Sequence, residues 1–266
     1  MTDQLIVVRG GGDLGSGVAL RLARCGFRIV VLEQPDPIAV RRTVSFSEAV
    51  YERSWKVEEV EGRLAYSSSE ALNLAGEGMV AVLVDPAGET LHALAPEGLV
   101  DAIMAKHNTG THRMMARAVV ALGPGFTAGV DCHTVVETNR GPHLGRCIWT
   151  GRAELDTGEP GPIAGKTGSR VLRAPREGRL TLSARIGEIV AQGARLADVS
   201  GKSVCAPFRG LVRGLARDGL TVKVGMKIGD VDPRLDPELC LLASDKALAV
   251  AGGVMEALCM VLDRSA

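Results

Sequence analysis

The chain has 266 residues, 46% of them hydrophobic and 23% charged, which is typical of a globular protein with one large or two modest domains. Its formal net charge is zero and only 3% of its residues are aromatic, which argues against nucleic-acid and acidic-membrane partners. Residues 1–4 lack the basic start of a signal peptide, and no apolar run reaches the ~18 residues that a membrane helix needs. The sequence therefore predicts a cytoplasmic protein without nucleic-acid or membrane partners.

The first part of the chain has the pattern of a strand, a glycine-rich turn, a helix and a second strand. In order these are apolar residues 4–8, Gly10-Gly11-Gly12-Asp13-Leu14-Gly15 after Arg9, a helical pattern over 16–25, and residues 27–32 before Glu33. A G-x-G-x-x-G turn between a strand and a helix, with an acid closing the next strand, is typical of dinucleotide-binding units. The sequence thus predicts a Rossmann-like first domain that binds NAD or a related nucleotide.

The three glycines of the G-x-G-x-x-G pattern have distinct expected roles. Gly10 permits the tight turn, Gly12 lets the backbone approach a pyrophosphate, and Gly15 lets helix and strand pack closely. The N-terminus of the helix supplies N–H groups and a partial positive charge. Glu33 is expected to accept hydrogen bonds from ribose hydroxyls. Asp13 also suits the first turn of a helix, and helix capping explains Ser16.

The predicted nucleotide site extends beyond the turn. Arg41 and Arg42 follow Glu33 and either hold phosphates bidentately or form an exposed basic turn. The full set of predicted cofactor-binding residues is Arg9, Gly10, Gly11, Gly12, Asp13, Leu14, Gly15, Glu33, Arg41, Arg42, Gly123 and Gly125.

The rest of the first domain alternates between strand and helix patterns. Strands are predicted at 65–66, 79–84, 118–122 and 135–136, and helices at 46–51, 69–74 and 96–106. This alternation predicts a doubly wound parallel sheet.

The loops that follow the later strands carry titratable side chains. The glycine-rich segment 123–129 follows a strand, so we expect it to face the same crevice as the first glycine turn, unless it is an ordinary surface turn. Asp131, His133, Glu137 and Arg140 then lie near it, and His133 and Glu137 are the candidate catalytic residues, His133 as an acid or base.

Six cysteines are scattered along the chain without any C-x-x-C pair. Free, mostly buried thiols in a reducing compartment are the expectation. A soft-metal site built from Cys132, His133, His143 and Cys147 is the alternative, but tetrahedral sites usually have tighter pairs, so no metal is predicted.

The second half of the chain contains a repeat with a 32-residue period. Residues 173–199 align with 205–231 without a gap, for example Ala174-Pro175 with Ala206-Pro207. Dense self-similarity of this kind indicates two copies of one β unit. The pattern resembles biotinyl/lipoyl-type hammerhead domains, in which a lysine between the halves is modified. Lys202 occupies the corresponding junction without the flanking methionines of those domains, so a structural or docking role is expected.

The stretches VVRGGGDLGSGVA, VLEQPDPIAVRRTVSFSEAVYE, LGPGFTAGVDCHTVVETNRG and KVGMKIGDVDPR carry a wider resemblance. The chain resembles the YqeB-type accessory proteins of the selenium-dependent molybdenum hydroxylase system, which are similar in their nucleotide-binding part to the XdhC group of maturation factors. The first glycine turn with Glu33 matches the nucleotide fingerprint of this family, and His133, Glu137 and Arg140 match its second signature. Pro142 interrupts that signature before His143, and Cys132 and Cys147 replace aliphatic residues, which further weakens a metal site.

The resemblance implies a maturation factor that binds a nucleotide or the molybdenum cofactor and docks a molybdenum hydroxylase client enzyme. An NAD-dependent oxidoreductase and a non-catalytic binding scaffold are the alternatives, and self-association stays open. The expected architecture is α/β, a Rossmann-like doubly wound parallel sheet with a smaller all-β hammerhead domain. Its predicted ranges are 1–165 for the nucleotide-binding domain, 166–236 for the β domain, and 237–266 for a C-terminal helix packed on the first domain.

Overall fold

The computed structural model describes residues 3–156, 158, 165 and 168–263. The chain divides into two compact units, each discontinuous in sequence. The α/β unit comprises Met1–Pro37, Ser45–Thr157 and Ala243–Ala266, and the β unit comprises Ile38–Val44 and Gly158–Leu242. Residues 38–44 therefore group with the β unit, although they lie inside the range predicted for the first domain.

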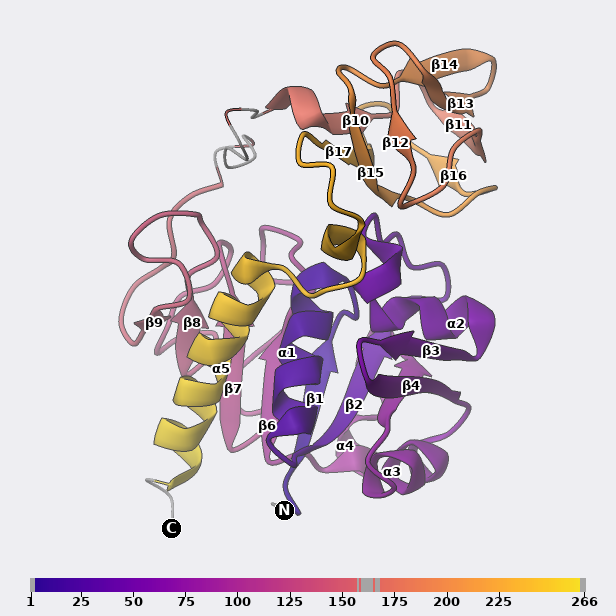
Figure 1. The fold of residues 1–266 in the computed structure, drawn as a ribbon. Helices are drawn as coiled ribbons and strands as arrows, with labels where there is room; N and C mark the ends of the chain where they lie inside the picture. Colours follow the sequence, from indigo (N-terminus) through magenta and orange to yellow (C-terminus); the bar gives the residue numbers. More distant parts are fainter. Residues whose placement is uncertain (1–2, 157, 159–164, 166–167, 264–266) are drawn as a thin grey trace. The chain divides into compact units, whose positions relative to one another are not determined.

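The α/β unit is built on a nine-stranded sheet with the order β3-β4-β5-β2-β1-β6-β7-β8-β9 (Figure 1). Its strands are β1 (Leu5–Arg9), β2 (Arg28–Glu33), β3 (Ser54–Val57), β4 (Val60–Ala65), β5 (Val80–Val84), β6 (Gly98–Asp101), β7 (Ala118–Leu122), β8 (Thr134–Val136) and β9 (Cys147–Ile148). Neighbours from β4 to β8 are parallel, whereas β3 pairs with β4 and β9 with β8 in antiparallel fashion. The sheet is mixed, so the prediction of a doubly wound parallel sheet is wrong.

The connections between strands also depart from the expected alternation. The predicted helix at 96–106 is instead β6, whose four residues are all buried between β1 and β7. A short apolar run such as Leu99-Val100 fits a buried strand and a helix equally well by periodicity alone, and burial on both faces decides for the strand. No helix lies between β6 and β7 or between β7 and β8, within a stretch that the structure describes throughout.

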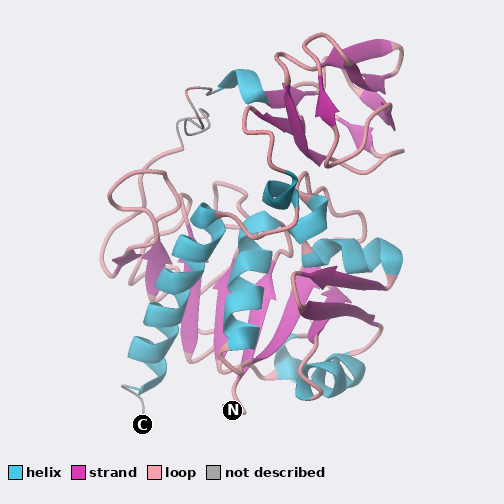
Figure 2. Ribbon diagram, viewed as in Figure 1, coloured by secondary structure: helices cyan, strands magenta, loops and turns pink. Residues whose placement is uncertain are grey.

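Five helices belong to the α/β unit in the described part of the chain. They are α1 (Asp13–Arg24), α2 (Ala49–Glu52), α3 (Ser68–Gly76), α4 (Leu91–Leu94) and α5 (Asp245–Asp263). The helix predicted at 69–74 is thus confirmed as α3, and the C-terminal helix predicted in 237–266 is α5. The helix predicted at 46–51 is a turn of 3-10 helix (Phe46–Glu48) followed by α2. Helices α1 and α5 lie side by side on the near face of the sheet in Figure 2, and none of the described helices is long and apolar enough to cross a membrane.

The two faces of the sheet have separate apolar cores because side chains alternate along each strand. Leu5 and Val7 of β1 pack in a cluster with α3 and α4, whereas Ile6 points to the other face. There, a β-carbon at Gly98 would lie 2.7 Å from Ile6 and 2.9 Å from Leu258 of α5. The absence of a side chain at Gly98 therefore lets α5 approach the sheet closely.

The β unit consists of two four-stranded antiparallel sheets, ordered β10-β17-β15-β12 and β14-β13-β11-β16. Its strands are β10 (Val171–Arg173), β11 (Gly178–Leu182), β12 (Ile189–Val190), β13 (Arg195–Val199), β14 (Lys202–Cys205), β15 (Gly210–Leu215), β16 (Thr221–Val222) and β17 (Lys227–Asp232). Single turns of 3-10 helix at Gly168–Arg170 and Pro237–Cys240 flank these strands. Adding 32 to the numbers of β10–β13 places each on β14–β17, and it converts one sheet order into the other.

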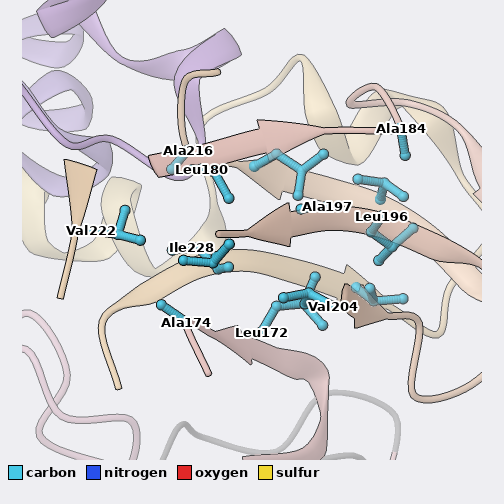
Figure 3. Packing of buried hydrophobic residues seen from close by; sticks show 14 of the residues in the cluster. Leu172, Ala174, Leu180, Ala184, Leu196, Ala197, Val204, Ala216, Val222 and Ile228 are labelled. Atoms are coloured by element: carbon cyan, nitrogen blue, oxygen red, sulfur yellow. The ribbon is translucent and has the colours of Figure 1, made fainter. Parts of the chain in front are cut away.

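Each sheet of the β unit therefore contains strands from both copies of the repeat. Residues of the core recur with the same 32-residue period. Leu172 is equivalent to Val204, and Leu196 is equivalent to Ile228. All four lie in one buried cluster (Figure 3). Because the copies exchange strands, neither copy can bury its apolar face alone. The expected pairing of a Rossmann-like sheet with a hammerhead is replaced by one mixed nine-stranded sheet and these two antiparallel sheets.

Helix α5 is held against the α/β unit by close backbone contacts. A β-carbon at Gly253 would lie 2.1 Å from the carbonyl oxygen of Gly145 and 2.9 Å from Val136. A β-carbon at the preceding Gly252 would meet only the end of the flexible Arg21 side chain, at 3.3 Å. Two adjacent glycines in one helix thus differ in whether a side chain fits.

This difference predicts opposite effects of one substitution. Gly253→Ala should lower the free energy of unfolding by about 1–3 kcal/mol because the added methyl group meets backbone that cannot move aside. Gly252→Ala should be neutral or stabilise by up to about 1 kcal/mol because alanine is the better helix former. Urea unfolding of both variants measures this, and equal effects would show that α5 does not pack as described.

Candidate functional site

The glycine turn is closed by side chains of the chain itself. Glu33, at the end of β2, is only 8% exposed, and its Oε2 accepts a hydrogen bond of 2.7 Å from the backbone N–H of Gly11. Its Oε1 accepts another from the N–H of Gln34, at 2.8 Å. Ser16 donates its hydroxyl to the carbonyl of Gly11 and accepts from the N–H of Phe46. The N–H of Gly11, one of the backbone donors of the turn, is therefore bound by the chain's own Glu33.

Burial changes the protonation of this carboxyl. Loss of hydration is the largest cause and raises the pKa of Glu33, while the hydrogen bonds from Gln34 and Gly11 act in the opposite direction. Both oxygens of the carboxylate bind backbone inside the turn instead of facing outward to ribose hydroxyls. These contacts do not fit the ribose-binding role expected for Glu33.

The glycines of the turn serve its own packing. Gly10 has a φ of +95° and its N–H donates to the carbonyl of Leu32. A β-carbon at Gly15 would lie 1.9 Å from the carbonyl oxygen of Gly10, so α1 approaches the turn as expected. A β-carbon at Gly12 would have no atom within 4 Å among the described residues. Asp13 and Leu14 open the first turn of α1 and are half-buried.

The arginines predicted to hold phosphate are engaged elsewhere. Arg9 is 3% exposed and donates to the hydroxyl of Thr111 and to the carbonyl of Pro86, beside Asp101. Arg41 donates to the carbonyls of Leu239 and Leu242, and Arg42 donates to that of Leu215, all inside the β unit. None of these three guanidinium groups lies on an exposed basic turn of the kind considered as the alternative.

The second glycine segment and Glu137 are likewise structural. A β-carbon at Gly123 would collide with the Thr138 hydroxyl, and one at Gly125 would lie 2.7 Å from the backbone nitrogen of His107. Glu137 is 2% exposed, and its carboxylate accepts hydrogen bonds from the backbone N–H groups of Thr138, Asn139 and Glu154. All its contacts here are with the backbone, as expected for a residue that orders loops.

His133 lies at the opposite end of β8 from Glu137, because it directly precedes Thr134 and Glu137 directly follows Val136. The carboxyl ends of the parallel strands, where the glycine turn lies, are therefore remote from His133. Asp131 accepts from the N–H of Thr127, and Arg140 pairs with Asp245. The structure does not bring the predicted group of titratable residues together.

A pocket of about 320 Å³ opens where His133 lies. We call it the arginine pocket. Arg113, Arg117, Gly129 and His133 contribute from segments that precede β7 and β8, and Trp149, Met260 and Val261 contribute from the residue after β9 and the last turn of α5. Since β9 runs antiparallel to β8, its final residue and the amino ends of β7 and β8 meet at the same edge of the sheet.

Hydrogen bonding fixes the protonation of His133. Its Nδ1 accepts a hydrogen bond of 2.9 Å from the backbone N–H of Val119, so the neutral ring carries its proton on Nε2. Burial is the main cause that lowers the pKa of His133, and the positive charge of Arg113 lowers it further. Arg113 is itself held by a hydrogen bond of 3.0 Å from its Nη1 to the carbonyl of Gly129. Around neutral pH the pocket therefore presents a neutral imidazole beside guanidinium groups.

The two thiols of the alternative soft-metal site are poor candidates for chemistry, whereas Cys25, Cys205 and Cys259 are exposed and not mostly buried as expected. Cys132 packs in the apolar cluster below β7 and β8, and burial raises its pKa to about 12. Burial likewise raises the pKa of Cys147 to about 11. Across residues 3–156, 158, 165 and 168–263, no three histidine, cysteine, aspartate or glutamate side chains gather as metal ligands.

Comparison with known proteins places the chain by sequence. No family model matches it. It is 49% identical to YqeB of Escherichia coli (strain K12), which is named as an uncharacterized protein, over 259 residues and 97% of this chain. The chain is a relative of YqeB. It spans about half of YqeB's length (48%), so activities and partners of a full-length YqeB are matters for proposal.

Similar solved structures are more distant than YqeB. One is an aspartoacylase family protein from Mesorhizobium loti, 14% identical, with a TM-score of 0.28 over 88% of this chain and 86% of that chain. Another is a succinylglutamate desuccinylase from Silicibacter sp. TM1040, 12% identical, with a TM-score of 0.26 over 86% and 85%. At TM-scores this low, the likeness transfers neither fold nor activity to the YqeB-related chain.

The contacts of the glycine turn correct the predicted function. The predicted functions, a molybdenum hydroxylase maturation factor and an NAD-dependent oxidoreductase, are wrong for this YqeB relative, and so is the Rossmann-like sheet on which they were based. The physical reason lies in the glycine turn, where Glu33 and Arg9 bind the chain's own groups.

Sequence reasoning missed Arg113, Arg117 and Trp149. Arg117 directly precedes β7 and His133 directly precedes β8, and such positions in parallel neighbours share an edge of the sheet. This placement could have been derived from the strand boundaries, whereas the approach of α5 could not.

The buried Glu33 carboxyl predicts a pH-dependent difference between the wild-type protein and Glu33→Gln. A pKa raised above its ordinary value of 4.5 means that the protonated acid stabilises the fold. This contribution is full below 4.5 and is lost as pH rises through the raised pKa. The wild type should therefore lose free energy of unfolding relative to Glu33→Gln between acid and neutral pH, as measured by urea unfolding at constant ionic strength. A wild type that gains free energy of unfolding relative to Glu33→Gln as pH rises would contradict the burial of this group.

Proposed function

We propose that the α/β unit binds a small anionic molecule in the arginine pocket. The observation that carries the proposal is the charge of the lining, since Arg113 and Arg117 both face one hollow and none of the lining residues in the described part of the chain is acidic. The imidazole of His133 adds a donor at Nε2, because its Nδ1 accepts from Val119. A lining of donors requires a ligand with acceptors, and guanidinium groups favour carboxylate or phosphate.

The fixed position of Arg113 supports the same proposal. Its hydrogen bond to the carbonyl of Gly129 joins two residues of the lining. A side chain held before the ligand arrives loses less conformational freedom on binding, which favours affinity. The volume of about 320 Å³ lies at the lower end of the range for small-molecule sites.

The other predicted ligands and partners stay predictions. NAD or a related nucleotide, the molybdenum cofactor, a client enzyme and self-association have no contact in the structure on which to argue them. The arginine pocket lies at the amino ends of β7 and β8, so an anion there would not use the glycine turn.

Binding can be measured by the thermal unfolding of the whole chain with acetate, inorganic phosphate or phenylacetate at constant ionic strength. A ligand that binds only the folded state raises the melting temperature by mass action. At least one of these anions should raise it, and Arg117→Gln should reduce the shift because one charge of the pocket is lost.

Arg63→Gln is the matched control, because Arg63 is an exposed arginine of β4, far along the same sheet, paired with Glu61. It should keep the full shift. If no anion stabilises the protein, or if Arg117→Gln and Arg63→Gln respond alike, the arginine pocket is not an anion site.

A further inference from the structure

The arginine pocket has a second chemistry beside its charge. Trp149, Met260 and Val261 line it with an indole ring, a thioether and an aliphatic group, all on half-buried residues. These apolar side chains would not stabilise a bare inorganic anion, because burial of apolar surface favours only a ligand that itself has an apolar part. The lining of the pocket therefore favours a molecule with a charged end and an apolar end.

The volume limits the size of that molecule. At about 320 Å³, the pocket lies near the lower limit of the range of small-molecule sites. This suits a single ring that bears one small charged group. An aromatic ring also matches the indole of Trp149, since aromatic pairs gain energy beyond the area they bury.

The helix end at the pocket bears on the charge of the ligand. Met260 and Val261 belong to the last turn of α5, which ends at Asp263. The carboxyl end of a helix carries a partial negative charge, which opposes a dianion more than a monoanion. One guanidinium nitrogen of Arg113 already donates to Gly129, which reduces the donors left for the several oxygens of a phosphate. A carboxylate is therefore favoured over a phosphate.

We infer that the arginine pocket takes an aromatic monocarboxylate of the size of phenylacetate. Its carboxylate lies against Arg113 and Arg117, and its ring lies against Trp149 and Met260. This inference rests on the anion site proposed above and adds the class of ligand. His133 contributes the Nε2–H as a neutral donor to a carboxylate oxygen.

Trp149 provides a direct readout of the ring. The chain has two tryptophans, Trp55 and Trp149, so a Trp55→Phe background leaves Trp149 as the sole indole. The indole nitrogen of Trp55 is buried without a hydrogen-bond partner among the described residues, so phenylalanine should replace it at little cost. Titration of this variant with phenylacetate should change Trp149 fluorescence and saturate.

Three matched probes separate the two ends of the ligand. Acetate keeps the carboxylate and lacks the ring, phenylacetamide keeps the ring and lacks the charge, and phenyl phosphate replaces the carboxylate. Each should bind about tenfold or more weakly than phenylacetate, because each lacks or replaces one of the two matched groups. Equal binding of acetate or phenyl phosphate would overturn the assignment to aromatic carboxylates.

Two substitutions distinguish the failure of this inference from that of the anion site. Measured by calorimetry, Trp149→Leu should weaken phenylacetate about tenfold and leave acetate unchanged, whereas Arg117→Gln should weaken both. If Arg117→Gln weakens acetate or phosphate but Trp149→Leu leaves phenylacetate unchanged, the anion site stands and the aromatic class is wrong. If none of the probes binds, both proposals fail.

Discussion

A buried ion pair holds the α/β unit together at the carboxyl edge of its sheet. Arg9 ends β1 and Asp101 ends its neighbour β6, with 3.6 Å between Nη1 and Oδ2. The hydroxyl of Thr111 accepts from Arg9 and donates to Asp101, so the long connection from β6 to β7 is tied to the same pair. Breaking such a pair leaves an uncompensated buried charge, which costs about 3–5 kcal/mol. The pair therefore also fixes the segment that carries Arg113 and Arg117 to the start of β7.

The sequence predicts the strands of this sheet better than its connections. A continuous apolar run such as 118–122 is long enough to be buried on both faces, and it became β7 with the same bounds. The run within 96–106 is predicted as a helix but contains β6. Four residues are too few for the apolar pattern to distinguish a buried strand from a helical turn. Burial between two other strands made the choice, and periodicity does not contain that information.

The β unit shows a different limit of prediction. The 32-residue period states which residues are equivalent, and Leu180 and Val212 are accordingly buried in the same core. The period does not predict which strands pair. In the structure, β10 and β12 lie in a sheet with β15 and β17 from the other copy. A repeat of sequence could equally have produced two independent sheets. Exchange of strands follows from the need of each copy to cover the apolar face of the other.

The sequence predicts a ligand site at the carboxyl ends of the parallel strands, whereas the structure has its candidate pocket at their amino ends. At the carboxyl ends of the strands, the glycine turn that resembles an anion site donates the N–H of Gly11 to Glu33 of the same chain. At the amino edge, where parallel strands begin, no motif marks a site. A connection between two parallel strands must, however, run back to the amino end of the second strand, so the last residues of the connection lie there. Arg117 and His133 are such residues, and the charge of Arg117 and the Nε2–H of His133 face a pocket to which no acidic side chain of the described residues contributes.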